Sequence, residues 1–145
     1  MQDERYDVGT PLNWLRRAKS NLIRAKQPKL EEVFWEDYCF DAQQAAEKAL
    51  KSLLLFHKIH FRFVHDIAEL LTVLEQNGIS LPEPIRTAAE LSDYAVEARY
   101  PGPMEPITED EYKEAIRIAD EVVSWVADIV MPVKKDASAK KGPID

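Results

Sequence analysis

WEDYCFDAQQAAEKALKSLLLFHK, residues 35–58, is the stretch that decides the fold. Its apolar residues recur at alternating spacings of four and three, the period of one side of a single long helix. These residues are Trp35, Cys39, Ala42, Ala46, Ala49, Leu53 and Phe56. The small alanines in the middle let neighbouring backbones come close. The stretch therefore predicts a long helix against which the rest of the chain packs.

A second line along the same predicted helix carries only polar side chains. It consists of Asp37, Asp41, Gln44, Lys48 and Lys51. Because these positions share the helical spacing but not the apolar character, we expect them to form a hydrated or functional side of the helix. The sequence thus separates a packing side from a chemical side on one element.

Other helices are predicted on both sides of this stretch. A cap at Thr10 and a proline at position 11 open a helix that runs to about residue 26. Its predicted buried side is Leu12, Leu15, Ala18, Leu22 and Ala25. A helix over residues 66–77 ends at a glycine, and another begins near residue 85 and carries Ala88, Leu91, Ala95 and Val96. A capping box at 108–111 opens the last helix, which ends near residue 130.

No segment alternates like a strand, and no repeat of fixed period occurs in the sequence. The predicted fold is all-α: an antiparallel up-and-down bundle of four main helices plus a short extra helix. We expect residues 10–131 to form this bundle. Residues 1–9 are then an N-terminal extension, and the lysine-rich residues 132–145 a disordered basic tail.

Composition limits the function classes. The 145 residues are one domain's worth of chain, and 46% of them are apolar. A net charge of −7 argues against general affinity for a phosphate backbone, so RNA is a less favoured partner. There is no signal-peptide pattern and no long uncharged apolar run, so the expected location is the cytoplasm without a membrane partner. The single cysteine, Cys39, is predicted to be a small core residue.

All three histidines fall in one basic, aromatic segment, HKIHFRFVHD at residues 57–66. One interpretation is a site for a phosphate or a nucleobase, helped by the dipole of the next helix. The other is a helix end, where cations are favoured in any case. His57 and His60 lie three residues apart, but no third ligand is indicated nearby, so no metal is expected.

Several segments together resemble the HEPN domain family of prokaryotes. They are LNWLRRA at 12–18, YCFDAQQAAEKALKSLL at 38–54, VHDI at 64–67 and ARYP at 98–101, and with the capped last helix they span residues 10 to 130. The resemblance implies a helical bundle that commonly dimerises, often made beside a small partner nucleotidyltransferase. Some members are metal-independent ribonucleases, often the toxins of toxin-antitoxin pairs. Others are thought to bind nucleotides or to act as non-catalytic companions.

The ribonuclease members use an arginine, four to six further residues and a histidine, which acts as a general base or acid. No arginine stands at those distances before His57, His60 or His65. Arg62 and His65 are too close together, and no histidine follows Arg99 at the required distance. The resemblance thus points to a family member without the catalytic pair, and we lean against an enzyme.

The sequence therefore predicts a dimeric, non-catalytic module that binds a nucleotide or a partner protein. The candidate nucleotide-binding residues are Asp41, Gln44, Lys48, Arg62, His65, Arg99 and Tyr100. Lys48 and Arg99 would meet phosphate, His65 would hydrogen-bond a phosphate or base, and Tyr100 would stack. The alternative for Gln44 and Lys48 is an internal polar network, and for Arg99 and Tyr100 a structural latch in a loop.

Two other functions stay open at this point. One is a metal-independent ribonuclease whose catalytic pair has drifted to Arg62 and His65. The other is a pure interaction protein, with Trp14, Trp35 and Trp125 near helix edges as a dimer or partner surface.

Overall fold

The structure is a computed structural model that describes residues 9–61, 66–91 and 106–132. In chain order the elements are α2 (Pro11–Ala25), α3 (Trp35–Phe56), α4 (Ile67–Gln76), α5 (Glu83–Arg86), the 3₁₀ helix η1 (Thr87–Leu91) and α7 (Glu109–Val130). These residues contain no strand. The prediction of an all-α bundle is confirmed. None of its described helices is long and apolar enough to cross a membrane.

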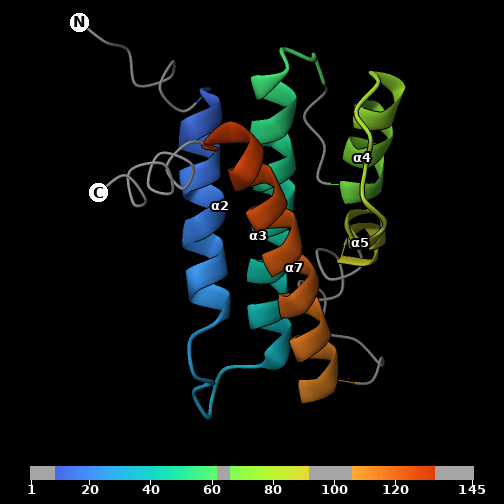
Figure 1. The fold of residues 1–145 in the computed structure, drawn as a ribbon. Helices are drawn as coiled ribbons and strands as arrows, with labels where there is room; N and C mark the ends of the chain where they lie inside the picture. Colours follow the sequence, from blue (N-terminus) through green and yellow to red (C-terminus); the bar gives the residue numbers. More distant parts are fainter. Residues whose placement is uncertain (1–8, 62–65, 92–105, 133–145) are drawn as a thin grey trace, which may run out of the picture.

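Helix α3 is the centre of the bundle, with α2 on one side, α7 on another, and α4 beside it (Figure 1). The chain reverses direction between α2 and α3, so that the end of α3 lies beside the start of α2. There the hydroxyl of Ser52 in α3 donates to the carbonyl of Pro11 in α2 at 2.7 Å. At the other end of α2, the Tyr112 hydroxyl of α7 donates to the Ala25 carbonyl at 2.7 Å. Helix α2 thus lies antiparallel to both of its neighbours.

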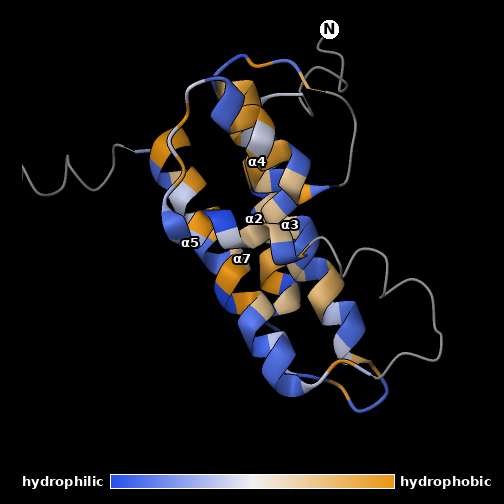
Figure 2. Cartoon of the chain, turned by 90° about the vertical axis from the view of Figure 1, so that its right-hand side faces the viewer, coloured by the Kyte–Doolittle hydropathy of each residue, from blue (hydrophilic) through white to orange (hydrophobic). Residues whose placement is uncertain are grey.

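The alanines of α3 make this close approach feasible. Ala42, Ala45, Ala46 and Ala49 are completely buried. Alanine loses no side-chain entropy on burial and leaves room for the larger side chains of the neighbouring helices. Hydrophilic and hydrophobic residues alternate along each helix in Figure 2, as expected of helices that bury one side. The predicted core position of the central helix is confirmed.

Helix ends follow the predicted signals. The Thr10 side chain accepts from the backbone of Asn13, and Asp66 caps α4 in the same way. At α7 the Thr108 side chain accepts from the Glu111 N–H, and the Glu111 carboxylate accepts from the Thr108 N–H at 2.8 Å. Gly78 has φ +85°, the left-handed conformation that ends α4.

The structure differs from the predictions at three points, two of which concern burial and one a helix. Leu12 and Phe56 are 48% and 42% exposed, because each lies on a terminal turn that its neighbouring helices do not cover. Lys51 is fully buried and not hydrated. The helix predicted near residue 85 is broken into α5 and η1, and its predicted residues Ala95 and Val96 lie outside the described residues.

Candidate functional site

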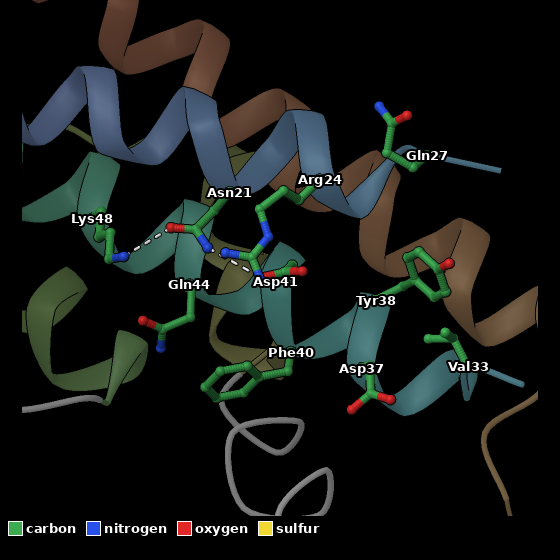
Figure 3. A pocket seen from close by; sticks show the side chains of 10 residues that line it. All are labelled: Asn21, Arg24, Gln27, Val33, Asp37, Tyr38, Phe40, Asp41, Gln44 and Lys48. Atoms are coloured by element: carbon green, nitrogen blue, oxygen red, sulfur yellow. Dashed lines mark hydrogen bonds and ion pairs between the residues drawn. The ribbon is translucent and has the colours of Figure 1, made fainter. Parts of the chain in front are cut away.

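An open groove of about 630 Å³ runs between α2 and α3 (Figure 3). Helix α2 and the connection that follows it contribute amide and guanidinium groups, and α3 contributes carboxylate, amide, ammonium and aromatic groups. The lining residues are Asn21, Arg24, Gln27, Val33, Asp37, Tyr38, Phe40, Asp41, Gln44 and Lys48. Almost all of the chemistry in the groove is therefore carried by two neighbouring helices that pack directly on each other.

Asn21 joins the two walls of the groove. Its side-chain Nδ2 donates to Asp41 Oδ1 at 3.1 Å, and its Oδ1 accepts from Lys48 Nζ at 2.8 Å. The residue is buried, and it occupies the side of α2 that packs on α3. The amide thus separates an anionic and a cationic side chain of α3 and holds both in place (Figure 3).

The ammonium of Lys48 lies in a mixed electrostatic environment. Burial lowers the pKa of Lys48 most, and the positive charges of Arg17 and Arg24 lower it further, while Glu47 and Asp41 oppose the shift. Arg24 and Lys48 both line the groove, so a guanidinium and an ammonium lie on its two walls.

Asp41 is the carboxylate that balances part of this charge. Its Oδ1 lies 3.5 Å from the Arg24 guanidinium, and its side chain is only 14% exposed, against 69% for Arg24. An ion pair with so exposed an arginine contributes little to stability. The pair with Asp41 therefore holds Arg24 only weakly at the groove.

A buried polar network lies directly behind the groove. Lys51 Nζ is 2.8 Å from Glu47 Oε2, and both side chains are 2% exposed. Glu47 Oε1 accepts from Gln43 at 3.0 Å and from Gln44 at 3.3 Å, and the Lys51 ammonium lies 5.6 Å from the centre of the Trp14 ring. The predicted polar line of α3 is thus divided: Lys51 belongs to the interior, and Gln44 connects this interior to the groove.

The structure brings together part of the predicted site. Asp41, Gln44 and Lys48 line the same groove. Arg62, His65, Arg99 and Tyr100, the other candidate residues, lie outside the described residues.

Other reactive side chains do not form a site in the described part of the chain. Cys39 is completely buried, and burial with the nearby charge of Glu36 raises the pKa of its thiol to about 12, so it is a core residue, as predicted. His57 and His60 are exposed. Within residues 9–61, 66–91 and 106–132 no three His, Cys, Asp or Glu side chains are grouped to hold a metal ion.

Sequence reasoning missed the contribution of α2 to the site. Asn21 lies three residues after Ala18 and four before Ala25, so it is a polar residue on the apolar side of that helix. A polar residue in such a position needs a hydrogen-bond partner, and this signal could have identified it. Arg24 and Phe40 gave no comparable signal, since exposed arginines and helix-edge phenylalanines are common.

The tryptophans are occupied by contacts within the chain. The Trp35 ring lies 4.6 Å from the Tyr112 ring, and the Lys29 ammonium lies 5.4 Å from the centre of the Trp35 ring. Trp14 faces Lys51, and Trp125 packs partly buried against the core. The most exposed large apolar side chains of the described residues are instead Ile23, Leu30 and Phe34, at 61%, 66% and 70% exposure.

Comparison with known proteins agrees with the all-helical fold and with the family resemblance of the sequence. The family model of the HEPN domain matches residues 12–129. The crystal structure of TT1696 from Thermus thermophilus is similar, with a TM-score of 0.72, 34% sequence identity, and 83% of this chain and 98% of that chain covered. The crystal structure of ST0689, an archaeal HEPN homologue, has a TM-score of 0.67 and 30% identity over the same shares of the two chains. No curated protein matches the sequence.

Proposed function

Since this chain belongs to the HEPN domain family, we propose that it is a non-catalytic member that binds a nucleotide in the groove between α2 and α3. The observation that carries the proposal is the shared position of Asp41, Gln44 and Lys48 in that groove, beside Arg24 and Phe40. A volume of about 630 Å³ falls within the range of roughly 300–1,000 Å³ that is usual for sites of small ligands.

The groove offers a separate chemical group for each part of a nucleotide. Phe40 provides an aromatic ring for stacking on a base. The Gln44 amide nitrogen donates to Gln43 at 2.8 Å and to Glu47 at 3.3 Å, which leaves its carbonyl oxygen to accept at a base edge. The Asp37 carboxylate is exposed and can accept from ribose hydroxyls. Lys48 and Arg24 supply positive charge for phosphate. Asn21 fixes Asp41 and Lys48 beforehand, so little order has to be gained on binding.

The chain lacks the features that the ribonuclease members need. The arginine-to-histidine spacing of those enzymes does not occur in the sequence, and the described lining of the groove contains no histidine. Binding without cleavage is therefore the function that best agrees with the groove. Metal-independent cleavage of single-stranded RNA by pure protein, abolished by His65→Ala, would favour the ribonuclease alternative with Arg62 and His65.

A thermal-shift screen with nucleotides tests the proposal. A ligand at a hundred times its Kd should add about 2.7 kcal/mol of stability, which for a chain of this size raises Tm by roughly 8 °C. Phe40→Leu should weaken binding, because base stacking on an aromatic ring is worth about 1–3 kcal/mol. Phe34→Leu is the matched control, since that ring is exposed outside the groove. If no nucleotide raises Tm, the proposal is wrong.

We further propose that the protein acts as a homodimer or as the companion of a small nucleotidyltransferase. Leu30 and Phe34, both in the connection between α2 and α3, support a protein contact, because large apolar side chains that are more than half exposed favour association. Sedimentation velocity at micromolar concentration tests the homodimer, and a strict monomer contradicts it. Co-purification with the product of a neighbouring nucleotidyltransferase reading frame tests the second partner.

A further inference from the structure

We infer that the Lys48 end of the groove is a polyphosphate subsite formed by Arg17, Arg24 and Lys48. The ligand class that it favours is a nucleoside di- or triphosphate over a nucleoside or monophosphate. This inference rests on the proposed function in that it places the phosphates in the same groove. The subsite itself can be tested with inorganic polyphosphate, without any nucleoside.

The first support is the placement of the three cations. Arg17, Asn21 and Arg24 are spaced four and three residues apart, so they share one side of α2. Asn21 is bonded to Lys48, which puts the ammonium opposite the middle of this line. One arginine lies about a helical turn before that point and the other about a turn after it. Arg24 and Lys48 line the groove, and Arg17 lies one turn farther along the same side of α2, beyond the lining residues.

The second support is the balance of charge. Residues 9–30 contain six cationic side chains and no Asp or Glu, although the whole chain has a net charge of −7. Two carboxylates act on Lys48, those of Asp41 and Glu47. Glu47 is also paired with Lys51 at 2.8 Å, and Asp41 is shared between Asn21 and Arg24. A local excess of positive charge in an acidic protein favours a polyanion at this point.

The third support is the number of N–H donors that the cations retain. In the described part of the chain Lys48 uses one donor on Asn21, and Arg17 uses its Nε–H on Asn13 at 2.8 Å. Among the described residues, the Arg24 guanidinium contacts Asp41 at 3.5 Å. An ammonium has three N–H donors and a guanidinium has five, so most of them remain available to phosphate oxygens.

The shape of the groove gives the ligand a direction. Figure 3 shows Lys48 at one end of the row of lining side chains and Asp37 and Val33 toward the other, with Gln44 and Phe40 along one edge between Lys48 and Asp37. Phosphates at Lys48 would place the nucleoside along Gln44 and Phe40, toward Asp37. A carboxylate at that far end repels phosphate and accepts from hydroxyls, so the opposite orientation is disfavoured.

Isothermal titration calorimetry of the full chain tests this subsite. Adenosine, AMP, ADP, ATP, orthophosphate and tripolyphosphate are titrated at fixed pH and about 0.1 M salt, where the Debye length is roughly 10 Å. We expect affinity to rise with the number of phosphates. Arg17→Gln, Arg24→Gln and Lys48→Gln should each weaken tripolyphosphate binding about tenfold, the loss expected for one charge-assisted hydrogen bond.

Lys19→Gln is the matched control for Arg17→Gln. Both substitutions remove one positive charge from an exposed position of α2, but residue 19 lies on the opposite side of that helix from residue 17. The control should leave the affinity nearly unchanged. Equal weakening by the two substitutions would mean attraction to the general field of α2, and the inference would be overturned. Because Arg17 is exposed, its variant remains informative even if Lys48→Gln lowers stability.

The remaining outcomes separate the two proposals. If adenosine binds as tightly as ATP, the phosphate subsite is refuted and the groove remains a nucleoside site. If no nucleotide binds but tripolyphosphate binds and needs Lys48, the subsite stands and the nucleotide proposal is wrong. If neither kind of ligand binds, both are wrong.

Discussion

Replacing Lys51 by methionine should destabilise this protein by about 3–5 kcal/mol, although the changed residue is a lysine on a helix. Its ammonium lies 2.8 Å from the Glu47 carboxylate, and both side chains are 2% exposed. At that separation the attraction is about 6 kcal/mol with an effective dielectric constant of roughly 20. Desolvation of two ions offsets most of it. Removing one partner leaves the desolvation penalty of the other without its compensation.

The double variant Glu47→Gln/Lys51→Met separates the charge from the shape. A glutamine at position 47 still offers a carbonyl oxygen to the buried Gln43 amide, which now donates to Glu47 at 3.0 Å. No uncompensated charge then remains at positions 47 and 51. We expect the double variant to recover at least about 2 kcal/mol relative to Lys51→Met alone, which is a favourable coupling between the two sites.

Urea denaturation followed by circular dichroism measures these differences, with unchanged m-values as the check on two-state behaviour. Lys113→Met is the matched control, because Lys113 also pairs with a glutamate four residues earlier but both partners are exposed. That control should change the free energy of unfolding by less than about 0.5 kcal/mol. If Lys51→Met has as small an effect as Lys113→Met, the buried pair does not exist in solution and the reasoning is refuted.

Three further predictions concern a helix end and two titrating groups with a shifted pKa. Thr108→Ala should lower stability by about 1 kcal/mol by removing the acceptor of the Glu111 N–H, as measured by urea denaturation. Cys39 should not react with iodoacetamide at about pH 8 in the native protein, since its thiol is buried with a pKa of about 12, and rapid labelling without unfolding would contradict this. Tripolyphosphate affinity should fall as the pH rises through the pKa of Lys48, which lies below 10.5, because only the ammonium form attracts the anion. Calorimetry at about pH 7 and about pH 10 checks the direction, and Lys48→Gln should lose the part of the pH dependence that comes from Lys48.

The candidate site was predictable to the extent that one helix carries it. Asp41, Gln44 and Lys48 have the spacing of one helix side, so their common position on α3 followed from the period alone. The amide that fixes Asp41 and Lys48 comes from Asn21, 20 residues before Asp41. Spacing within α3 could not indicate that partner, because it depends on how α2 packs.

Lys51 shows the same limit in the core. On the helix it continues the polar line of Lys48, and a lysine is rarely buried. What buries it is the approach of α2 with Trp14, together with the Glu47 carboxylate one turn earlier. The helical period gives the direction in which a side chain points around the axis of its helix. Whether water or another helix lies at that angle is a property of the packed bundle.

The sequence by itself determined the helices, their caps, the alanine-lined centre of α3 and the family to which the chain belongs, because period, capping residues and side-chain size are local properties that neighbours in the chain already carry. Only the tertiary structure decided which polar side chains face the groove and which are enclosed behind it. The burial of Asn21 and Lys51 and the hydrogen bond between Asn21 and Lys48 depend on how closely α2 packs on α3. That approach is set by packing between residues far apart in the chain.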